Sequence, residues 1–509
     1  MESKRLVELR DAAVKGGAQK YHDKNTERGK LFARERIARL VDEGSFVEDG
    51  VLANCTAGDL PSDGVVTGFG TLEGRPVAVI ANDSTVKAGS WGKRTVEKIL
   101  RLQEAVATRL CPVIYLVDSA GARITDQLEM FPGRRGAGRI FFNQVSFSGL
   151  VPQVCLLFGP SAAGGAYIPA FCDVVVMVKK NASMYLGSPR MAEMVIGEKV
   201  SLEEMGGAKM HTKESGVGDV LVATEPEAIG FAKRYLAYMP DHCEKGVAST
   251  PAVAPKPDLK SLEQIIIPDE NKPFDMKEVV EHLVDEGTFL ELKARYAKEM
   301  ITGFARIDGR AVGIVANQPK YLGGVLFVKS ANKAARFVQL CNAFNIPLVF
   351  LADVPGFMIG SKVEKQGIIR AGAKMVAAVS MATVPKICVV VRKAYGAGLY
   401  AMCGPAFSPD ATLAFPTAAI AVMGPQAAVN AVYFNRIQAV PEGPERDALV
   451  SQLRDEYRAD VDLEKLAAEM VIDDLIPFEA FRKEVSRRLL QCENKQVTQV
   501  RRKHCIMPM

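Results

Sequence analysis

Two short glycine-containing stretches are the residues of this chain that could do chemistry with their backbone. The first, VPQVCLLFGPSAAGGAY at 151–167, reads as an apolar strand that runs into a turn of small residues. Because Gly164 and Gly165 carry no side chain, consecutive N–H groups can face one point and hold an oxygen that gains negative charge. Taken alone, a Gly-Gly pair is also what an ordinary tight turn uses.

A second stretch of the same design lies 233 residues further on. The segment VPKICVVVRKAYGAGLY, at 384–400, places Ala397 and Gly398 where the first stretch has Gly164 and Gly165. The sequence therefore predicts two backbone oxyanion sites of related design in one chain.

Side chains that could serve as a general base or a metal ligand are not evident in the sequence. None of the five histidines stands beside a G-x-S-x-G elbow or at metal-ligand spacing, and no Walker A sequence occurs. His211, inside a glycine-rich motif, favours a structural hydrogen-bonding role, and Asp118 and Asp353 end strands and look architectural. We expect no metal in this chain and a base that arrives with the substrate or the cofactor.

A third turn of small residues follows the strand that ends at Asp118. Its residues are Ala120, Gly121 and Ala122, and Arg123 beside them could meet a phosphate or a carboxylate. A plain strand-to-helix turn would look the same. The counterpart in the second half has Gly356 and Phe357 instead, so the two pockets should bind different ligands.

The sequence segments that must position these turns occur twice along the chain. The segment LVDEGSFVE (40–48) returns as LVDEGTFLE (283–291), and 67–83 returns as 302–318 with an offset of 235 that also relates Asp118 to Asp353. This spacing indicates two homologous halves produced by an internal duplication.

Each half alternates short apolar strands with amphipathic helices, which predicts α/β domains. In the first half we expect strands at 77–81, 114–117 and 154–158, helices at 95–109 and 139–148, and a charged helical lead-in over residues 1 to about 34. A proline-rich stretch, 240–275, reads as the linker, so the expected domains are 1–255 and 256–509.

Composition narrows the class of protein. The net charge of +5 suits an anionic small molecule better than nucleic acid, and the apolar runs are too short for a membrane span. Ten cysteines without a CxxC pair indicate reduced thiols in a cytoplasmic protein.

Several motifs in a fixed order resemble one family, the carboxyltransferase (β) subunits of biotin-dependent acyl-CoA carboxylases, with propionyl-CoA and methylcrotonyl-CoA carboxylases as the nearest members. The resemblance covers roughly residues 25 to 490. The motifs that carry it are DSAGARI, FFNQVSFSGLVPQ, GPSAAGGAY, GGAKMH with SGVGD, ADVPGFMIG, QGIIRAGAKM, VPKICVVVRKAYGAG and MCGPAFSPD.

The resemblance implies two crotonase-like (ClpP/crotonase) domains in a hexamer, a trimer of dimers, whose active sites form between the N-terminal domain of one subunit and the C-terminal domain of another. It implies that Gly164 and Gly165 hold the thioester oxygen of an acyl-CoA as an enolate, and that Ala397 and Gly398 hold the ureido oxygen of biotin. The remaining implied site residues are Ala120, Gly121, Ala122, Arg123 and Ala166 for the acyl-CoA, and Gly356 and Phe357 for the biotin ring.

The implied reaction moves a carboxyl group from carboxybiotin to the α or vinylogous γ carbon of a short-chain acyl-CoA. No biotinyl-lysine sequence and no ATP-binding carboxylase domain is present, so the partners implied are a biotin carboxyl carrier and a biotin carboxylase. The run at 126–144 resembles the methylcrotonyl type and GARI (121–124) the propionyl type, which leaves the acyl chain open. Two alternatives also stay open: an acyl-CoA decarboxylase α subunit or transcarboxylase that runs the same transfer in reverse, and a non-catalytic CoA-binding scaffold.

Overall fold

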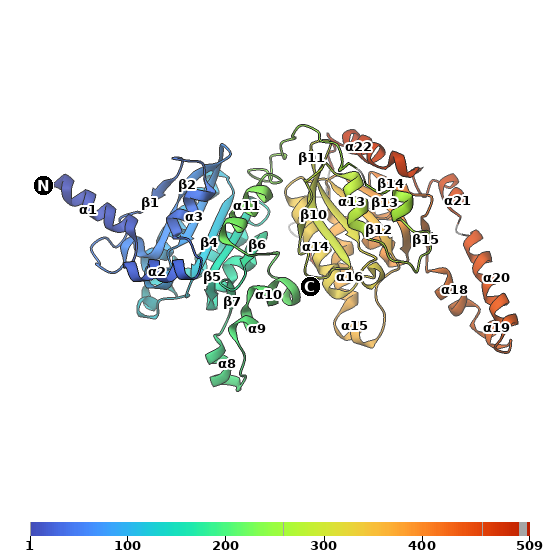
Figure 1. Ribbon diagram of the computed structural model, residues 1–509, viewed down its shortest axis with the longest axis horizontal. Coiled ribbons are helices and arrows are strands. Elements are labelled where there is room, and N and C mark those ends of the chain that lie inside the picture. The colour runs from blue at the N-terminus through green and yellow to red at the C-terminus, as the bar shows by residue number, and fades with distance from the viewer. Residues whose placement is uncertain (1, 258, 461, 498–505, 509) are drawn as a thin grey trace. The chain divides into compact units, whose positions relative to one another are not determined.

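The protein divides into two compact units, Met1–Gly246 and Val247–Met509, each built on one eight-stranded sheet (Figure 1). The computed structural model describes residues 2–257, 259–460, 462–497 and 506–508. The division lies ahead of the predicted boundary at 255/256, because the chain already bonds to the second unit before residue 255. Thr250 N donates to Gly309 O at 3.0 Å, and Arg306 Nη1 donates to Ala248 O at 3.0 Å.

The sheet of the first unit is antiparallel over its first three strands and parallel beyond them, in the order β1-β2-β3-β4-β5-β6-β8, with β7 beside the end of β5. The strands are β1 (Val47–Asp49), β2 (Val65–Leu72), β3 (Arg75–Asn82), β4 (Val113–Ser119), β5 (Gln153–Ala162), β6 (Val174–Val178), β7 (Ser183–Tyr185) and β8 (Val220–Val222). The α-helices are α1 (Glu2–Lys15), α2 (Gln19–Glu27), α3 (Ala33–Leu40), α4 (Lys93–Arg109), α5 (Gln127–Met130), α6 (Ala137–Phe147), α7 (Tyr167–Phe171), α8 (Pro189–Ile196), α9 (Leu202–Gly206), α10 (Ala208–Met210) and α11 (Glu225–Leu236).

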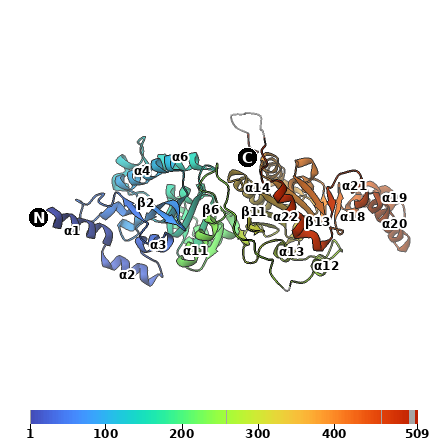
Figure 2. The ribbon, with the colours of Figure 1, turned by 90° about the horizontal axis from the view of Figure 1, so that it is seen from above.

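Helices cover both faces of this sheet, with α4 and α6 on one face and α3 and α11 on the other (Figure 2). Strand β4, VIYLVDS, is buried along its whole length, as is nearly all of β5. A parallel strand covered on both faces must be apolar throughout, which explains why these segments read as continuous apolar runs.

The sheet of the second unit has the same topology, in the order β9-β10-β11-β12-β13-β14-β16, with β15 beside β13. Its strands are β9 (Leu290–Leu292), β10 (Met300–Ile307), β11 (Arg310–Asn317), β12 (Leu348–Val354), β13 (Lys386–Tyr395), β14 (Ala411–Ala414), β15 (Ala419–Ala421) and β16 (Asp474–Leu475). Its helices are α12 (Leu262–Ile265), α13 (Met276–Leu283), α14 (Val328–Ala343), α15 (Ser361–Lys365), α16 (Ile368–Met381), α17 (Ala397–Ala401), α18 (Pro425–Val432), α19 (Phe434–Gln438), α20 (Pro444–Asp460), α21 (Leu463–Ala468) and α22 (Phe481–Gln491).

The backbone repeats the duplication at the level of single residues. The bounds of β10, β11 and β12 equal those of β2, β3 and β4 shifted by 235, and the bounds of β13 equal those of β5 shifted by 233. Ala163 and Gly396, which follow β5 and β13, share a φ of +53°. The internal duplication that the sequence predicts is therefore confirmed.

Three local expectations need correction. Strand β5 does not end at Phe158 but continues through Gly159 and Pro160 to Ala162, because its last residues pair with the short strand β7. The charged lead-in is three helices, α1 to α3, and the helices expected at 95–109 and 139–148 begin at Lys93 and Ala137.

The proline-rich stretch 240–275 is more than a linker, because basic side chains of the second unit bind its backbone. Arg392 Nη1 donates to the carbonyl oxygens of Ile267 (2.9 Å), Asp269 (2.8 Å) and Lys272 (2.9 Å), and Lys393 Nζ donates to Glu270 O at 3.0 Å. These bonds fix residues 267–272, which lie between α12 and α13 and belong to no helix or strand.

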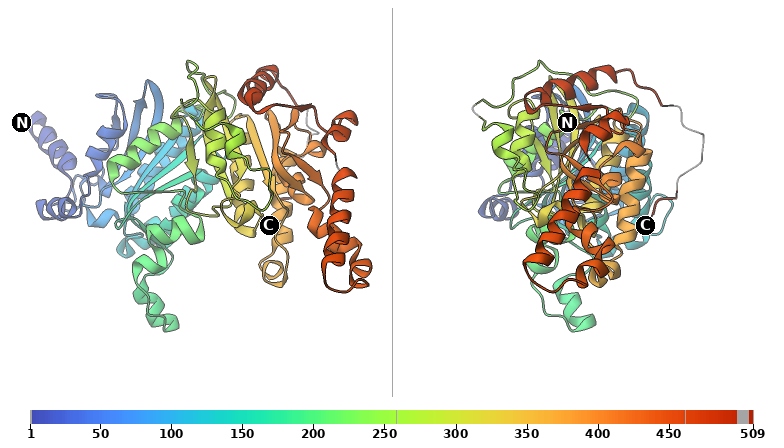
Figure 3. Two further views of the ribbon diagram at one scale, coloured as in Figure 1. Left: turned by 45° about the vertical axis from the view of Figure 1, so that its right-hand side comes forward. Right: turned by 90° about the vertical axis from the view of Figure 1, so that its right-hand side faces the viewer.

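Some helices extend away from the sheets, as α8 does in the first unit and α18 to α20 do in the second (Figure 3). Within the described residues, no helix combines the length and apolar character that crossing a membrane would require.

Each unit buries a lysine at equivalent positions of α4 and α14. Lys98 Nζ donates to Ser62 Oγ at 2.6 Å, and Lys333 Nζ donates to the carbonyl oxygens of Met300 (2.6 Å), Lys293 (2.9 Å), Tyr296 (2.9 Å) and Ala297 (3.3 Å). Burial lowers the pKa of Lys98 to about 8 and that of Lys333 to about 7. Lys98 Nζ also donates to Val65 O at 2.5 Å, at the start of β2, as Lys333 Nζ donates to Met300 O at the start of β10. These acceptors compensate the burial, so each lysine connects the start of a strand to the helix that covers it.

Replacing Lys333 by Met should lower the stability of the protein, because four carbonyl groups lose their donor while the apolar stem is kept. We expect a loss of roughly 3 kcal/mol, read as a lower midpoint of denaturant unfolding. The matched control, Lys483→Met, changes an exposed lysine of α22 and should leave the midpoint nearly unchanged. Equal midpoints for the two variants would contradict a structural role for Lys333.

Candidate functional site

The first predicted oxyanion turn lies at the carboxyl end of β5. Residues Ala163–Ala166 form one turn of 3₁₀-helix, and the chain continues directly into α7. The first N–H groups of such a turn have no acceptor within it, and Gly164 belongs to this set. Gly164 is exposed, and a methyl group on it would meet no atom within 4 Å. The turn therefore offers an accessible backbone donor with open space in front of it.

Gly165, next to it, is buried, and its backbone stabilises the turn. Its carbonyl oxygen accepts a hydrogen bond of 2.9 Å from Ser161 Oγ, and a methyl group on it would lie 3.9 Å from Trp91 Cζ2. Ala166, the third predicted residue of this turn, is half-buried.

The turn after β4 is held beside this site through Trp91. Trp91 N donates to Gly121 O at 2.8 Å, Arg123 N donates to Trp91 O at 2.8 Å, and Ala120 N donates to Ala88 O at 3.0 Å. A methyl group on Gly121, whose φ is +93°, would lie 3.1 Å from Ala162 O at the end of β5. The structure thus brings the Ala120–Ala122 turn and the Gly164–Gly165 turn together within the first unit.

The guanidinium group of Arg123 forms ion pairs with carboxylates. Its Nη1 lies 2.8 Å from Asp63 Oδ1 and 3.1 Å from Asp126 Oδ2, and its Nη2 donates to Ser90 O at 3.1 Å. Of the two partners that the sequence allowed for this guanidinium, it has a carboxylate. Its role here is to position the turn, and a phosphate would have to compete with Asp63.

The second oxyanion turn lies at the carboxyl end of β13. Ala397 and Gly398 are the first two residues of α17, so their N–H groups have no acceptor within the helix. Ala397 is exposed and Gly398 is buried, the same pattern as Gly164 and Gly165. A methyl group on Gly398 would lie 2.8 Å from Val354 Cγ2 and 3.1 Å from Gly356 Cα, so only glycine fits there.

Gly356 and Phe357 join this turn from the end of β12. Gly356 has a φ of +124°, and its carbonyl oxygen accepts a bond of 3.0 Å from Leu326 N. The Phe357 ring packs on α16, where a methyl group on Gly372 would come within 3.1 Å of it. The structure therefore gathers Gly356 next to Gly398 in the second unit, as it gathers Gly121 next to β5 in the first.

Both strand-end aspartates are structural. Asp118 is buried between Lys30 (2.6 Å) and Arg36 (3.2 Å), and Asp353 pairs with Arg392 at 2.9 Å. Burial acts to raise the pKa of Asp118, but Arg36 and Lys30 outweigh it and the net shift is downwards. Asp118 is therefore a fixed anion, and the buried ion pairs of both aspartates agree with their architectural interpretation.

His211 uses both ring nitrogens inside the first unit. Nε2 donates to Met184 O at 2.8 Å, and Nδ1 lies 2.8 Å from Ser215 Oγ. Burial lowers the pKa of His211, so the neutral ring is favoured. These bonds agree with a structural role. Among the residues that the structure describes, no group of three or more His, Cys, Asp or Glu side chains could hold a metal ion.

Sequence reasoning missed Trp91, which links the two turns of the first unit, and Asp63, which fixes Arg123. The signal for Trp91 was its place in the repeat: it corresponds to Leu326, which bridges to Phe357 as Trp91 bridges to Ala122. Asp63 stands in a loop without periodicity and left no signal.

Comparison with known proteins identifies the family of this chain. Residues 24–507 match the carboxyl transferase domain family. The chain is 60% identical to the uncharacterized carboxylase YngE of Bacillus subtilis (strain 168), over 99% of each chain. It is 40% identical to the propionyl-CoA carboxylase beta chain of Saccharopolyspora erythraea, over 98% of this chain and 94% of that one.

A solved structure shares the whole fold. The crystal structure of transcarboxylase 12S with methylmalonyl-coenzyme A and methylmalonic acid bound superimposes with a TM-score of 0.93 at 37% identity, covering 100% of this chain and 99% of that one. The predicted fold class is therefore confirmed: α/β, with two homologous crotonase-like domains. The chain belongs to the carboxyl transferase family and is a carboxyltransferase.

Proposed function

We propose that this protein is the carboxyltransferase subunit of a biotin-dependent acyl-CoA carboxylase, with the acyl-CoA bound by the first unit and biotin by the second. The observation that carries the proposal is the pair of strand-end turns whose N–H groups have no acceptor within their own turn, at Gly164 and at Ala397–Gly398. A cytoplasmic location is proposed with it, because cysteines such as Cys155 and Cys388 are buried inside strands and pack there as small apolar side chains.

Two backbone sites suit a reaction in which negative charge develops on two carbonyl oxygens. In the first unit, the Gly164 and Gly165 turn would hold the thioester oxygen as the α carbon loses its proton. Donors that are already oriented stabilise such an oxygen by about 3 kcal/mol each. Gly121 keeps the Ala120–Ala122 backbone against β5, so the acyl-CoA would lie along this edge of the sheet.

In the second unit, Ala397 and Gly398 would hold the ureido oxygen of biotin, and Gly356 and Phe357 would flank its ring. Exposed Ala397 beside buried Gly398 suits a small carbonyl ligand, because the two residues that carry the N–H groups have no side chain larger than a methyl group. When bound, carboxybiotin would supply the carboxyl group, and its ring nitrogen would supply the base that the sequence motifs of this chain do not indicate.

The carboxylase direction is favoured over the reverse reaction. The relatives include the methylmalonyl-CoA decarboxylase subunit alpha of Veillonella parvula (37% identical), but also carboxylase subunits such as the 3-methylcrotonyl-coenzyme A carboxylase beta1 subunit of Mycobacterium tuberculosis (43% identical). The 60% identical relative is itself described as a carboxylase. A non-catalytic scaffold is less well supported, because both turns keep their N–H groups accessible.

We also propose that copies of the chain assemble as a hexamer with a separate biotin carrier and biotin carboxylase. The transcarboxylase 12S structure is described as a hexamer assembly. Large apolar side chains surround the first turn on α6 and α7: Phe142, Val145, Tyr167 and Phe171 are exposed by 58%, 55%, 46% and 36%. In the second unit Tyr400, which corresponds to Tyr167, is exposed by 47%. Contact between copies would cover such surfaces.

Turnover against a panel of acyl-CoA esters tests the activity. With carboxybiotin as donor, the purified protein should carboxylate at least one of acetyl-, propionyl-, butyryl- and 3-methylcrotonyl-CoA, measured as incorporation of the labelled carboxyl group. The preferred ester would identify the acyl chain. Absence of turnover with all four esters, in protein that is folded and oligomeric, would count against the proposal.

Matched substitutions at the two turns test the assignment of the units. Gly164→Val and Ala397→Val place the same side chain at equivalent exposed positions, where neither should disturb folding. Gly164→Val should lower kcat at least about 100-fold while biotin binding is kept, and Ala397→Val should weaken use of biotin while acyl-CoA binding is kept. Gly398 is unsuitable for this test, because any side chain there meets Val354.

Binding of acyl-CoA and of biotin is measured separately for each variant by calorimetry. Gly138→Val, at an exposed glycine of α6 with no atom within 4 Å, is the control for adding a branched side chain. Equal loss of both ligands in Gly164→Val and in Ala397→Val would mean that the two units are assigned wrongly.

A further inference from the structure

The loop between β3 and α4 carries Trp91, the only tryptophan of the chain, and the backbone bonds of this position do not require that residue. Leu326 occupies the equivalent position of the second unit. Trp91 N donates to Gly121 O at 2.8 Å. Leu326 N donates to Gly356 O, its counterpart, at 3.0 Å. Because leucine makes the same backbone bond, the indole must be explained by what its side chain contacts.

The indole supports the first oxyanion turn from the core side. A methyl group on Gly165 would lie 3.6 Å from Ser161 Oγ and 3.9 Å from Trp91 Cζ2. Trp91 is 4% exposed and belongs to the hydrophobic core of the first unit. The buried residue of the turn therefore faces a ring that is itself packed into the core.

A different residue supports the equivalent turn of the second unit. A methyl group on Gly398 would lie 2.8 Å from Val354 Cγ2, at the end of β12. The first-unit counterpart of Val354 is Ser119, which is smaller. The first unit thus combines Ser119 with Trp91, and the second combines Val354 with Leu326. A smaller strand-end residue goes with a larger loop residue, so the two positions together fill the space below the turn.

The N–H group of the indole forms no bond that would explain the tryptophan. Trp91 Nε1 is buried and has no hydrogen-bond acceptor among the residues that the structure describes. A buried donor without an acceptor lowers the stability of a fold, and leucine at the equivalent position avoids that cost. What the indole contributes is therefore its shape and its contact with the turn.

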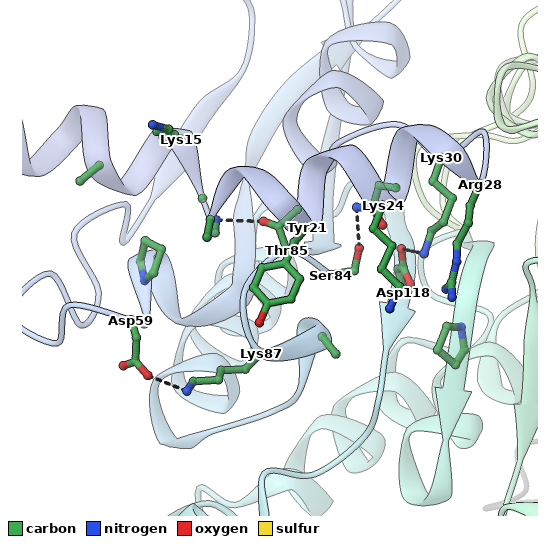
Figure 4. Close-up of a pocket in the computed structure, with 18 of the residues that line it drawn as sticks. Lys15, Tyr21, Lys24, Arg28, Lys30, Asp59, Ser84, Thr85, Lys87 and Asp118 are labelled. Atoms are coloured by element: carbon green, nitrogen blue, oxygen red, sulfur yellow. Dashed lines mark hydrogen bonds and ion pairs between the residues drawn. The ribbon is translucent and has the colours of Figure 1, made fainter.

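The loop that carries Trp91 is also bound by the N-terminal helices (Figure 4). Gly17 N donates to Thr85 Oγ1 at 2.9 Å, and Asn25 Nδ2 donates to Ser84 Oγ at 3.2 Å. A cavity of about 810 Å³ lies between this loop and helices α1 and α2. Among its lining residues, three cations form no ion pair with any described residue: Lys15, Lys24 and Arg28. The loop is thus held by contacts that involve neither oxyanion turn.

Aromatic contacts continue from Trp91 to the far side of the turn. The ring centroids of Trp91 and Phe141 lie 6.3 Å apart, and those of Phe141 and Tyr167 lie 6.0 Å apart. Tyr167 begins α7 directly after the turn, and its N–H donates to the carbonyl oxygens of Gly164 and Gly165. Trp91 thus contacts the turn at Gly165 and, through Phe141, at Tyr167.

We propose that Trp91 is a positioning residue for carboxyl transfer. Its indole holds the Ala163–Ala166 turn in the geometry that stabilises the acyl-CoA oxygen, as Val354 holds the turn on the biotin side. The assignment rests on the proposed function for these two ligands. Because Trp91 acts through Gly165, its loss should affect the transition state more than the binding of the acyl-CoA.

Hydrogen exchange of the full chain tests the position of the turn without turnover. Trp91→Leu installs the loop residue of the second unit. Phe147→Leu is the control, because it removes a ring with the same 4% exposure from the same core. In Trp91→Leu the amides of 163–168 should exchange at least about tenfold faster than in the wild type, with those of 397–401 unchanged. Unchanged exchange at 163–168, or equal acceleration in the control, would overturn the proposal.

A double variant tests whether the strand end and the loop share the support of the turn. Ser119→Val in the Trp91→Leu background installs the pair that the second unit uses. It should bring exchange at 163–168 back to within about threefold of the wild type, because the branched side chain refills the space below Gly165. A double variant that exchanges as fast as Trp91→Leu would overturn the proposal. If Trp91→Leu does not fold, Trp91→Phe takes its place in both comparisons.

Steady-state kinetics test whether the position of the turn matters for the reaction. With the ester that the wild type carboxylates, Trp91→Leu should lower kcat at least about tenfold, and KM for the acyl-CoA and for biotin should stay within about twofold. Trp91→Phe, which keeps a ring, should have an intermediate kcat, and Phe147→Leu should keep the wild-type kcat. A raised KM for the acyl-CoA with an unchanged kcat would place Trp91 in the binding surface and overturn its positioning role.

The two proposals fail in different ways. A chain that carboxylates no acyl-CoA, but in which Trp91→Leu speeds exchange at 163–168, contradicts the proposed function alone. A chain that carboxylates acyl-CoA with the same kcat in Trp91→Leu and in the wild type contradicts the positioning role alone.

Discussion

The fold of each unit depends on one buried carboxylate at the end of its central strand. Asp118 and Asp353 are 1% and 0% exposed, and a buried charge is tolerated only when it is paired and hydrogen-bonded. In the second unit the partner comes from the adjacent strand, because Arg392 of β13 reaches across to Asp353. In the first unit the equivalent position on β5 is Gly159, where a methyl group would lie 1.8 Å from Asp118 Oδ1. There the cations come from Lys30 and from Arg36 of α3, and Arg36 is itself held by Glu225 at 2.7 Å.

This difference explains why the two homologous sheets are covered by different segments of the chain. Arg392 satisfies Asp353 and also binds three carbonyl groups of the 267–272 segment, so the stretch before α13 is drawn onto the second unit. In the first unit Lys30 lies on the segment between α2 and α3 and Arg36 lies on α3, so pairing with Asp118 draws the N-terminal helices onto the sheet. Each guanidinium also lies over a ring, Arg36 over Phe158 at 4.5 Å and Arg392 over Phe274 at 4.8 Å. Both units have an aspartate at this strand end. The element that supplies its cationic partner determines which segment covers that edge of the sheet.

Much of the fold and part of the site could be predicted from the sequence, because repetition is a signal that needs no structure. The offset between the halves located β10 to β13, and the small-residue turns at 164–165 and 397–398 were found by their composition. The extension of β5 to Ala162 was missed because Gly159 and Pro160 look like the start of a turn, whereas pairing with β7 keeps them extended. The packing of 248–272 was missed because irregular backbone held by arginine side chains has no period to detect. The cavity residues of α1 and α2 were missed for a related reason, since a polar helix face without buried residues reads as solvated.

The two units also differ at the loop that follows β3 in the first unit and β11 in the second. The second-unit equivalents of Ser84, Thr85 and Lys87 are Pro319, Lys320 and Leu322, and there Lys320 pairs with Asp275 at 2.9 Å. Asp275 also accepts a bond of 2.6 Å from Gln318 and caps α13, so the loop after β11 is closed by a carboxylate from its own covering segment. In the first unit the covering segment brings Lys15, Lys24 and Arg28 instead of an acid, and the loop after β3 faces uncompensated positive charge. Duplication thus supplied two equal sheet edges with equal backbone turns. The sign of the charge on the segment that lies over each edge is what distinguishes the two edges.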